Sequence, residues 1–226
     1  MRILAIIPAY NEQDCLEQTI RSLESMCPSI DYLIVNDGST DDTKQICERN
    51  HFSHVNLPVN SGLSVGFQTG MKYADRHGYD AAVQFDADGQ HLPEYIIPMG
   101  HALEEQQADI VIASRTLAGE APAGARGAGS KIISALIRLT SGVRLTDPTS
   151  GMRMYSRRMI GEFAKGYDLT PEPDTVALLA RKGCKVIEVP ARMQERQGGE
   201  SYFDFTHVIA YMSRVCFSIL LFQWFR

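Results

Sequence analysis

The chain has 226 residues, of which 44% are hydrophobic and 22% are charged, and its formal net charge is −5. This length suits one domain with a full core, and the acidic balance argues against a general nucleic-acid-binding role. An anionic ligand would therefore have to be held by local basic residues or by a metal ion.

The first half of the chain alternates strand-like and helix-like segments. Buried strands are predicted at residues 2–9, 32–36, 55–57, 81–85 and 109–114, and helices at 12–26, 63–76 and 93–106. Ser39, with Asp42 three residues later, is typical of another helix start. Repeated strand–helix units predict an α/β domain with a mainly parallel sheet flanked by helices. Right-handed crossovers place a ligand cleft at the carboxyl ends of such strands.

The second half is less regular. Residues 116–130, rich in Gly and Ala, predict a long mobile loop, and residues 197–200 predict a second flexible loop. Helices are predicted at 131–140 and 175–182, and strands at 152–156 and 185–189. Because no repeat or linker is evident, we expect one domain over residues 1–204, followed by one helix over residues 205–226.

The C-terminal segment has the apolar spacing of one helix face, and Phe222, Trp224 and Phe225 add aromatic side chains on other faces. It is shorter than the ~20 apolar residues that a transmembrane helix needs. Two interpretations stay open. The helix either packs on its own domain, or docks as an amphipathic helix on a membrane surface or a partner, since terminal aromatic residues favour interfaces.

The five cysteines are far apart and form no C-x-x-C pair. An odd number with such spacing argues against a disulfide framework or a zinc site, so we expect free buried thiols in a reducing cytosol. The apolar run at residues 3–7 is too short for a signal peptide and predicts a buried strand.

Two carboxylates, Asp86 and Asp88, follow the predicted strand at 81–85. Carboxylates this close repel each other unless a cation joins them, and hard oxygen ligands suit Mg²⁺ or Mn²⁺. Gln90 and His91 are candidates for further ligands or supporting contacts. The alternative is an ordinary acidic turn in solvent.

Two other strand ends carry candidate ligand-binding residues. Asp37 follows a buried strand, and Gly38 permits a sharp turn, so the carboxylate could accept a hydrogen bond from a nucleotide base or could cap the next helix. Tyr10 could pack beside a base, and Asn11 could cap a helix. The sequence has neither a dinucleotide-binding glycine fingerprint, nor a P-loop, nor a G-x-S-x-G elbow.

Four segments, "IIPAYNE", "VNDGSTDDT", "FDADGQH" and "DPTSGMRMYSR", occur in an order and spacing that resemble the family 2 glycosyltransferases. The resemblance is strongest to the branch of dolichyl- and polyprenyl-phosphate sugar synthases, and it covers residues 6–201. It implies a GT-A fold, inversion at the anomeric carbon and a nucleotide-diphosphate-sugar donor.

The resemblance also implies site roles. The nucleotide-binding residues would be Pro8, Ala9, Tyr10, Glu12, Asp37 and Asp86; the metal ligands would be Asp86, Asp88 and Gln90, with Mg²⁺ or Mn²⁺ as cofactor. The acceptor-phosphate residues would be Arg126, Arg153 and Arg196, and the catalytic residues would be Asp88, Arg153 and Arg196.

These roles agree with elementary chemistry. A metal ion stabilises a leaving nucleoside diphosphate without proton transfer, and an arginine fork suits a phosphate, although a lone arginine is more often a solvated surface charge. A phosphate acceptor is already ionised and needs no strong base, unlike a sugar hydroxyl. Glu172 or Asp174, in the acidic segment 170–174, could be a base for a hydroxyl acceptor or could only orient arginines.

The leading interpretation is an inverting hexosyl- or N-acetylhexosaminyltransferase for cell-surface glycan synthesis, which uses a polyprenyl-phosphate acceptor and, on family frequency, a UDP-sugar. It would lie on the inner face of the cell membrane, held by its terminal helix, by a small membrane-protein partner or by a second copy. The alternatives are transfer to a sugar hydroxyl and a non-catalytic nucleotide-sugar-binding protein. A sugar-nucleotidyltransferase is disfavoured because no Gly-rich basic loop follows the first strand.

Overall fold

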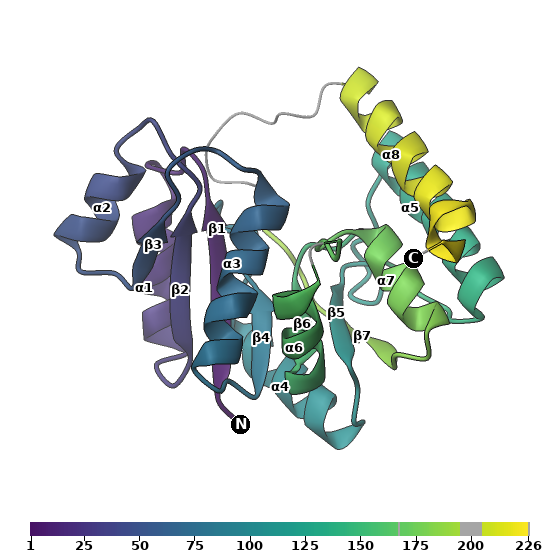
Figure 1. Cartoon of the computed structure of the whole chain (residues 1–226), viewed down its shortest axis with the longest axis horizontal. Helices are drawn as coiled ribbons and strands as arrows, with labels where there is room; N and C mark the ends of the chain where they lie inside the picture. Colours follow the sequence, from purple (N-terminus) through teal and green to yellow (C-terminus); the bar gives the residue numbers. More distant parts are fainter. Residues whose placement is uncertain (167, 195–204, 226) are drawn as a thin grey trace.

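The computed structural model describes residues 1–166, 168–194 and 205–225. Within them a seven-stranded sheet has the order β3-β2-β1-β4-β6-β5-β7 (Figure 1). The strands are β1 (Ile3–Ala9), β2 (Asp31–Asn36), β3 (His54–Asn56), β4 (Ala81–Gln84), β5 (Ile110–Ser114), β6 (Arg153–Ser156) and β7 (Val186–Pro190).

All strand pairs are parallel except those of β6, which runs antiparallel to both β4 and β5. The prediction of a mainly parallel α/β sheet is therefore confirmed. The reversal of β6 matters for the site, because it places the start of β6 beside the carboxyl end of β4.

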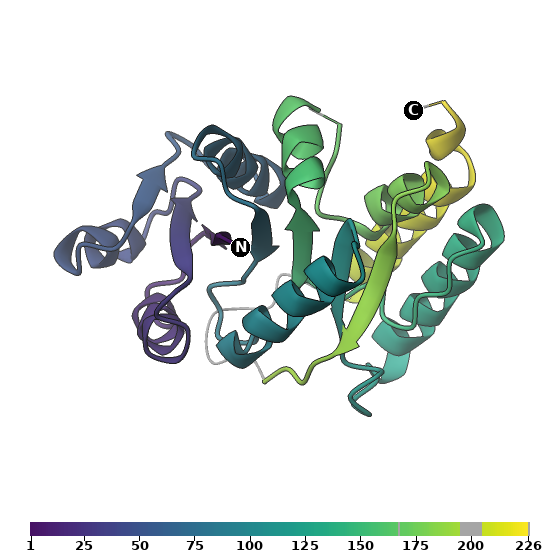
Figure 2. The same ribbon diagram turned by 90° about the horizontal axis from the view of Figure 1, so that it is seen from below.

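Helices cover both faces of the sheet (Figure 2). The α-helices are α1 (Leu16–Met26), α2 (Thr43–Arg49), α3 (Leu63–Arg76), α4 (Ile96–Glu105), α5 (Gly124–Ser141), α6 (Arg157–Lys165), α7 (Pro173–Arg181) and α8 (Phe205–Leu220). Two short 3-10 helices are η1 (Pro93–Tyr95) and η2 (Phe222–Trp224).

The side chains of β1 alternate between two hydrophobic cores, as the two-residue period of a strand requires. Ala5 and Ile7 join the core under α1, α2 and α4, whereas Leu4 and Ile6 join the core under α3, α5, α6, α7 and α8. A strand that is buried on both faces reads as a continuous apolar run, which is why the sequence indicated it so clearly.

Two helix starts differ from the sequence prediction. Helix α1 begins at Leu16 and not at residue 12, and α2 begins at Thr43 with Asp42 as its N-cap residue. Ser39 does not cap a helix, because its hydroxyl accepts a hydrogen bond from the Asn11 N–H. The polar side chains of the two turns bond to each other, and Asp41 Oδ1 also accepts a hydrogen bond from the Thr43 N–H at the start of α2.

The prediction of a mobile loop over residues 116–130 was wrong in its second half, because α5 already begins at Gly124. The glycines there permit close packing. A Cβ at Gly127 would lie 2.0 Å from the Pro122 carbonyl oxygen, and one at Gly129 would lie 1.9 Å from Met212 Cε of α8. Composition alone could not distinguish a flexible loop from a glycine-lined helix contact.

Helix α6 was not predicted, although Ser156 caps it by accepting a hydrogen bond from the Met159 N–H. The C-terminal helix α8 lies beside α5 (Figure 1), and its Val215 and Ile219 are buried in the domain core. In the part of the chain that the structure describes, no helix combines the length and the apolarity needed to cross a bilayer. All five cysteines are free, as expected.

Glycine packing gives a test of the fold. Gly70 of α3 lies against β1, where an added Cβ would be 2.3 Å from Ile6 Cγ2. Gly70→Ala should therefore lower the free energy of unfolding by about 1–3 kcal/mol through overpacking. Gly161→Ala in α6 is the control, since a Cβ there meets no atom within 4 Å. It should be neutral or stabilise by up to ~1 kcal/mol. Equal melting temperatures in thermal unfolding would contradict this packing.

Candidate active site

Three strand ends meet at one edge of the sheet, because β1 lies between β2 and β4 and all three are parallel. The residues that follow them include Tyr10, Asp37 and Asp86, so the backbone brings these three positions to the same edge of the sheet. The start of the reversed strand β6 adds residues 147–153 to the same edge.

The turns after β1 and β2 form one hydrogen-bonded unit. The Asp37 N–H donates to the Ala9 carbonyl at 2.8 Å, and the Thr40 N–H donates to Asn11 Oδ1 at 2.9 Å. Asn11 has a φ of 55°, a left-handed conformation that asparagine tolerates better than most residues. The Glu12 N–H donates to Thr43 Oγ1 at 2.9 Å. The predicted nucleotide-binding turns therefore share a rigid frame.

Asp37 is buried, and both of its carboxylate oxygens accept backbone hydrogen bonds, from Ser61 at 2.8 Å and from Gly62 at 2.7 Å. Gly62 is the N-cap residue of α3, so Asp37 anchors the entry to α3 and not to the next helix, α2. A Cβ at Gly38 would lie 2.5 Å from the Val59 carbonyl carbon, so the loop before α3 packs directly on this turn. Sequence reasoning missed this loop.

The acidic turn after β4 is held by short contacts. Gln84 Nε2 donates to Asp86 Oδ1 at 3.1 Å, and the Gln90 N–H donates to Asp88 Oδ1 at 3.0 Å. The side chain of Asp86 is 31% exposed, whereas Asp88 is only 9% exposed. From α1, Thr19 Oγ1 donates to the Ala87 carbonyl at 3.0 Å. The turn is thus fixed on several sides and is not an acidic loop in solvent.

His91 is buried behind this turn and supports Asp86. Its Nδ1 accepts a hydrogen bond from the Asp86 N–H at 2.9 Å, so in the neutral ring the proton is on Nε2, which lies 3.5 Å from Asp86 Oδ2. Gly151 closes the other side, because a Cβ there would lie 3.1 Å from Asp86 Oδ2. His91 acts as a support for Asp86 in this arrangement, and Gly151 is a site residue to which the sequence assigned no role.

The acidic turn fits a divalent cation that is completed by a ligand. Among the residues described, no group of three or more His, Cys, Asp or Glu side chains could hold a metal by itself. Mg²⁺ characteristically takes one or two carboxylates together with substrate phosphate oxygens, and the pair Asp86 and Asp88 can supply those carboxylates. The side chain of Gln90, half-buried beside them, is a further oxygen donor.

A partly buried ion pair organises the segment before β6. Arg115, directly after β5, binds Asp147 in a bidentate manner, at 2.7 Å from Nε to Oδ2 and 2.8 Å from Nη2 to Oδ1. Glu188 of β7 accepts from the N–H groups of Thr146 and Asp147, both at 2.7 Å. These residues were missed individually, although the matching segment "DPTSGMRMYSR" begins at Asp147.

Arg153 is 2% exposed, and its guanidinium donates to three backbone carbonyls. The bonds go to Ser150 at 2.8 Å, Pro148 at 2.9 Å and Pro171 at 3.0 Å. These contacts favour a positioning role, and its acceptor-phosphate role stays a prediction. Arg126 is exposed in the first turn of α5, where its role also stays a prediction. Arg196 lies outside the described residues.

The acidic segment before α7 contacts α8. Glu172 accepts a short hydrogen bond from Tyr211 Oη, and Asp174 Oδ2 accepts one from Ser218 Oγ at 2.6 Å. Burial and the Glu172 carboxylate raise the pKa of the Tyr211 phenol, which therefore stays protonated and donating at neutral pH. Both candidate bases are thus engaged by the C-terminal helix.

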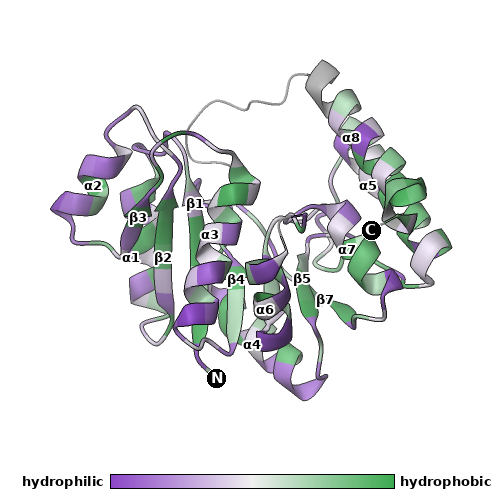
Figure 3. Ribbon diagram, viewed as in Figure 1, coloured by the Kyte–Doolittle hydropathy of each residue, from purple (hydrophilic) through white to green (hydrophobic). Residues whose placement is uncertain are grey.

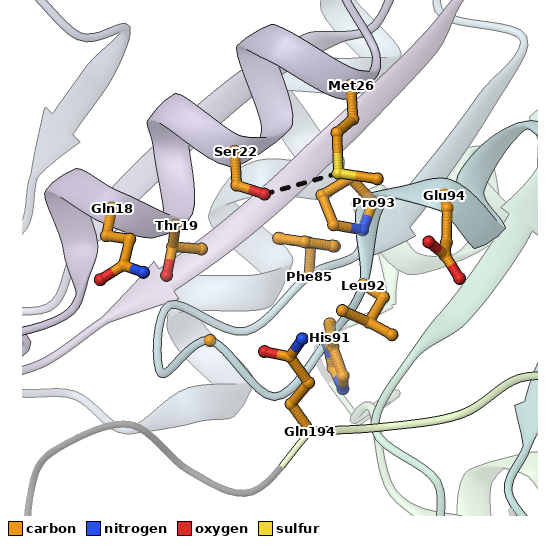
Figure 4. A pocket seen from close by; sticks show the side chains of 11 residues that line it. Gln18, Thr19, Ser22, Met26, Phe85, His91, Leu92, Pro93, Glu94 and Gln194 are labelled. Carbon is orange, nitrogen blue, oxygen red and sulfur yellow. Dashed lines mark hydrogen bonds between the residues drawn. The ribbon is translucent and has the colours of Figure 1, made fainter.

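A cavity of about 320 Å³ lies between α1 and the acidic turn (Figure 4). Thr19 and Ser22 of α1 line one side, and Gly89 and His91 line another. Gln194 borders it, and the Gln194 N–H donates to the Gln90 carbonyl at 3.0 Å. The cavity therefore adjoins the acidic turn, and amide and hydroxyl groups form much of its polar lining.

The fold is that of an α/β protein in which three parallel strand ends meet at one edge of the sheet, and sequence comparison gives the family of the chain. Residues 4–163 match the model of glycosyl transferase family 2, and the chain belongs to this family.

Two curated relatives cover most of the chain. An undecaprenyl-phosphate mannosyltransferase from Micrococcus luteus is 33% identical, over 89% of this chain and 87% of the relative. A polyprenol monophosphomannose synthase from Mycolicibacterium smegmatis is 30% identical, over 95% of this chain and 85% of the relative. These are the polyprenyl-phosphate sugar synthase branch that the sequence motifs indicated.

The fold is shared with a glucosyl-3-phosphoglycerate synthase from Mycobacterium tuberculosis, solved with Mn²⁺, UDP and phosphoglyceric acid. The TM-score is 0.67 at 16% identity, and the match covers 98% of this chain and 78% of that chain. The prediction of a GT-A fold is confirmed.

Arg153 can be tested for its two candidate roles. Arg153→Lys should lower the free energy of unfolding by about 2–4 kcal/mol, because one ammonium cannot replace three bonds to buried carbonyls. Arg157→Lys is the control, since the side chains of the Arg157–Asp75 ion pair are 49% and 34% exposed and the pair should contribute less than ~1 kcal/mol. Denaturant unfolding measures both variants. If Arg153→Lys kept wild-type stability and only the KM of the acceptor rose, the phosphate-binding role would be favoured instead.

Proposed function

We propose that this enzyme transfers a sugar from a nucleotide-diphosphate sugar to a polyprenyl phosphate at a membrane surface. The observation that carries the proposal is the convergence of the turns after β1, β2 and β4, with Asp86 and Asp88 held in the turn after β4. Two relatives of at least 30% identity that are named for polyprenyl- or undecaprenyl-phosphate mannose transfer support this acceptor class.

The names of both relatives favour mannose as the transferred sugar. Mannose is usually carried by GDP, so the expectation of a UDP-sugar stays a prediction that competes with GDP-mannose. In the proposed complex, the nucleotide lies over the rigid frame formed by Pro8–Glu12 and Asp37. Tyr10 is half-buried at the edge of this frame and would pack beside the base.

The proposed reaction forms a bond between an acceptor phosphate oxygen and the anomeric carbon, and breaks the bond from that carbon to the donor diphosphate. The acceptor oxygen is already ionised, so no residue has to remove a proton. A divalent cation bound by Asp86 and Asp88 would stabilise the charge that develops on the leaving nucleoside diphosphate. His91 keeps Asp86 oriented for this task, and Gly151 leaves space beside the Asp86 carboxylate.

The C-terminal surface supports membrane association. Phe217, Phe222, Trp224 and Phe225 are exposed by 58–89%, and Figure 3 shows hydrophobic residues along α5 and α8. Such an aromatic cluster is typical of helices that lie in the interface. Arg214, with a side chain that is 63% exposed, can meet anionic headgroups. The inner leaflet of the cell membrane is the proposed location, and a partner protein or second copy would be an alternative attachment.

Transfer can be measured directly. Purified protein with Mg²⁺ or Mn²⁺, undecaprenyl phosphate and labelled GDP-mannose or UDP-sugars should give a lipid-extractable product. Asp88→Asn should lower kcat by at least about 10²-fold while the fold is kept, because it removes the charge of a proposed metal ligand. Glu104→Gln, at an exposed position of α4, is the charge-matched control. With a soluble glycan added as a second acceptor, label in the glycan instead of the lipid would favour a hydroxyl acceptor. Donor binding without any product would favour the non-catalytic alternative.

Membrane attachment can be tested without truncation, which would remove the buried residues Val215 and Ile219. The double variant Trp224→Ser/Phe225→Ser should weaken binding to phosphatidylglycerol vesicles by at least about tenfold, since each buried aromatic contributes roughly 1.5–3 kcal/mol. Val65→Ser removes an exposed apolar side chain from α3 and is the control. Vesicle flotation measures binding, and unchanged flotation of the double variant would overturn the proposed docking surface.

A further inference from the structure

Two acids near the start of α7 hold the C-terminal helix α8 by its hydroxyl groups. Glu172 is the N-cap residue of α7, and Asp174 lies in its first turn. Their partners on α8, Tyr211 and Ser218, are about two helical turns apart and therefore lie on one face of the helix. The two contacts together fix both the position and the rotation of α8 against α7.

Both oxygens of Glu172 are directed at α8. One accepts from Tyr211 Oη, and the other lies 3.9 Å from Arg214 Nη2. The side chain of Glu172 is only 18% exposed, so the bond to Tyr211 is shielded from competing water. A carboxylate engaged in this way is well placed to hold a helix and poorly placed to accept a proton from a substrate.

The same segment leads to the acidic turn of the site. Pro171, next to Glu172, offers its carbonyl to Arg153, and the same guanidinium holds the carbonyl of Ser150. The next residue, Gly151, lies beside Asp86, because a Cβ added there would be 3.1 Å from Asp86 Oδ2. A series of hydrogen bonds therefore runs from α8 through the acidic segment and Arg153 to a segment beside the proposed metal ligand.

We propose that Glu172 and Asp174 are positioning residues, which hold α8 and its lipid-docking surface at a fixed place relative to Asp86 and Asp88. This rests on the proposed transfer to a polyprenyl phosphate. A lipid-anchored phosphate reaches the site at a height set by the docking helix, and a misplacement of ~1 Å can cost about 10² in rate. A short, water-soluble acceptor enters from solution and does not depend on that height.

The test pairs four variants with two acceptors. Tyr211→Phe/Ser218→Ala removes both donors from α8, and Ser213→Ala, at an exposed position of the same helix, is the control. We expect the double variant to lower kcat/KM at least tenfold for undecaprenyl phosphate in vesicles and less than twofold for a short-chain prenyl phosphate. Glu172→Gln keeps an acceptor oxygen for Tyr211 and should retain at least half of the kcat/KM for undecaprenyl phosphate. Glu172→Ala should lower this kcat/KM as much as Tyr211→Phe/Ser218→Ala does.

Hydrogen exchange of the α8 amides supplies a measurement that does not depend on turnover. Exchange should be faster in the double variant and unchanged in Ser213→Ala. If α8 stays equally protected in the double variant, the positioning role is wrong, whatever the transfer assay gives. Equal loss of activity in Glu172→Gln and Glu172→Ala on both acceptors would overturn it in favour of a general base. If wild-type protein transfers no sugar to the lipid, the proposed function fails, while the exchange result still decides whether the acids hold α8.

Discussion

The insertion of one reversed strand into a parallel sheet is the constraint on which the site depends. Because β6 runs antiparallel between β4 and β5, its first residues lie beside the carboxyl end of β4, where Asp86 and Asp88 emerge. Residues 147–152, just before β6, lie outside the sheet, so their backbone polar groups need hydrogen-bond partners other than a neighbouring strand. The buried Arg153 supplies three hydrogen bonds to carbonyls, and the ion pair of Arg115 with Asp147 fixes the rest.

The acidic residues of this chain divide by what they bind. The carboxylates of Asp37, Asp147 and Glu188 accept hydrogen bonds from backbone N–H groups and from one arginine, and so hold loops together. Asp86 keeps part of its surface open at the end of a strand, beside a histidine that orients it. A charged ligand can use a carboxylate only if that carboxylate is held in place without being fully satisfied, and this arrangement meets both conditions.

The GT-A fold and the positions of the strand ends could be predicted from the sequence. The contacts that several side chains make could not. The apolar strands β1, β2 and β4 were recognisable because they are buried on both faces. The position of Asp37 at a strand end could be predicted, but its bonds to Ser61 and Gly62 join segments that no local pattern connects. The burial of Arg153 could not be predicted from the sequence, and α6 was missed although Ser156 caps it.

By itself, the sequence determined the strand and helix periods, which follow from local spacing and residue type, and the order of the motifs through which the chain resembles its family. Only the tertiary structure decided which polar groups form hydrogen bonds and ion pairs within the protein. In the structure, the Gly-rich stretch that begins at residue 124 is a helix packed on α8. The sequence could not show this, because glycine is typical both of flexible loops and of helices that approach each other closely. The tertiary structure also brought Glu172 and Asp174 against α8, since long-range contacts between hydroxyls and carboxylates depend on how helices pack and leave no periodic trace in the chain.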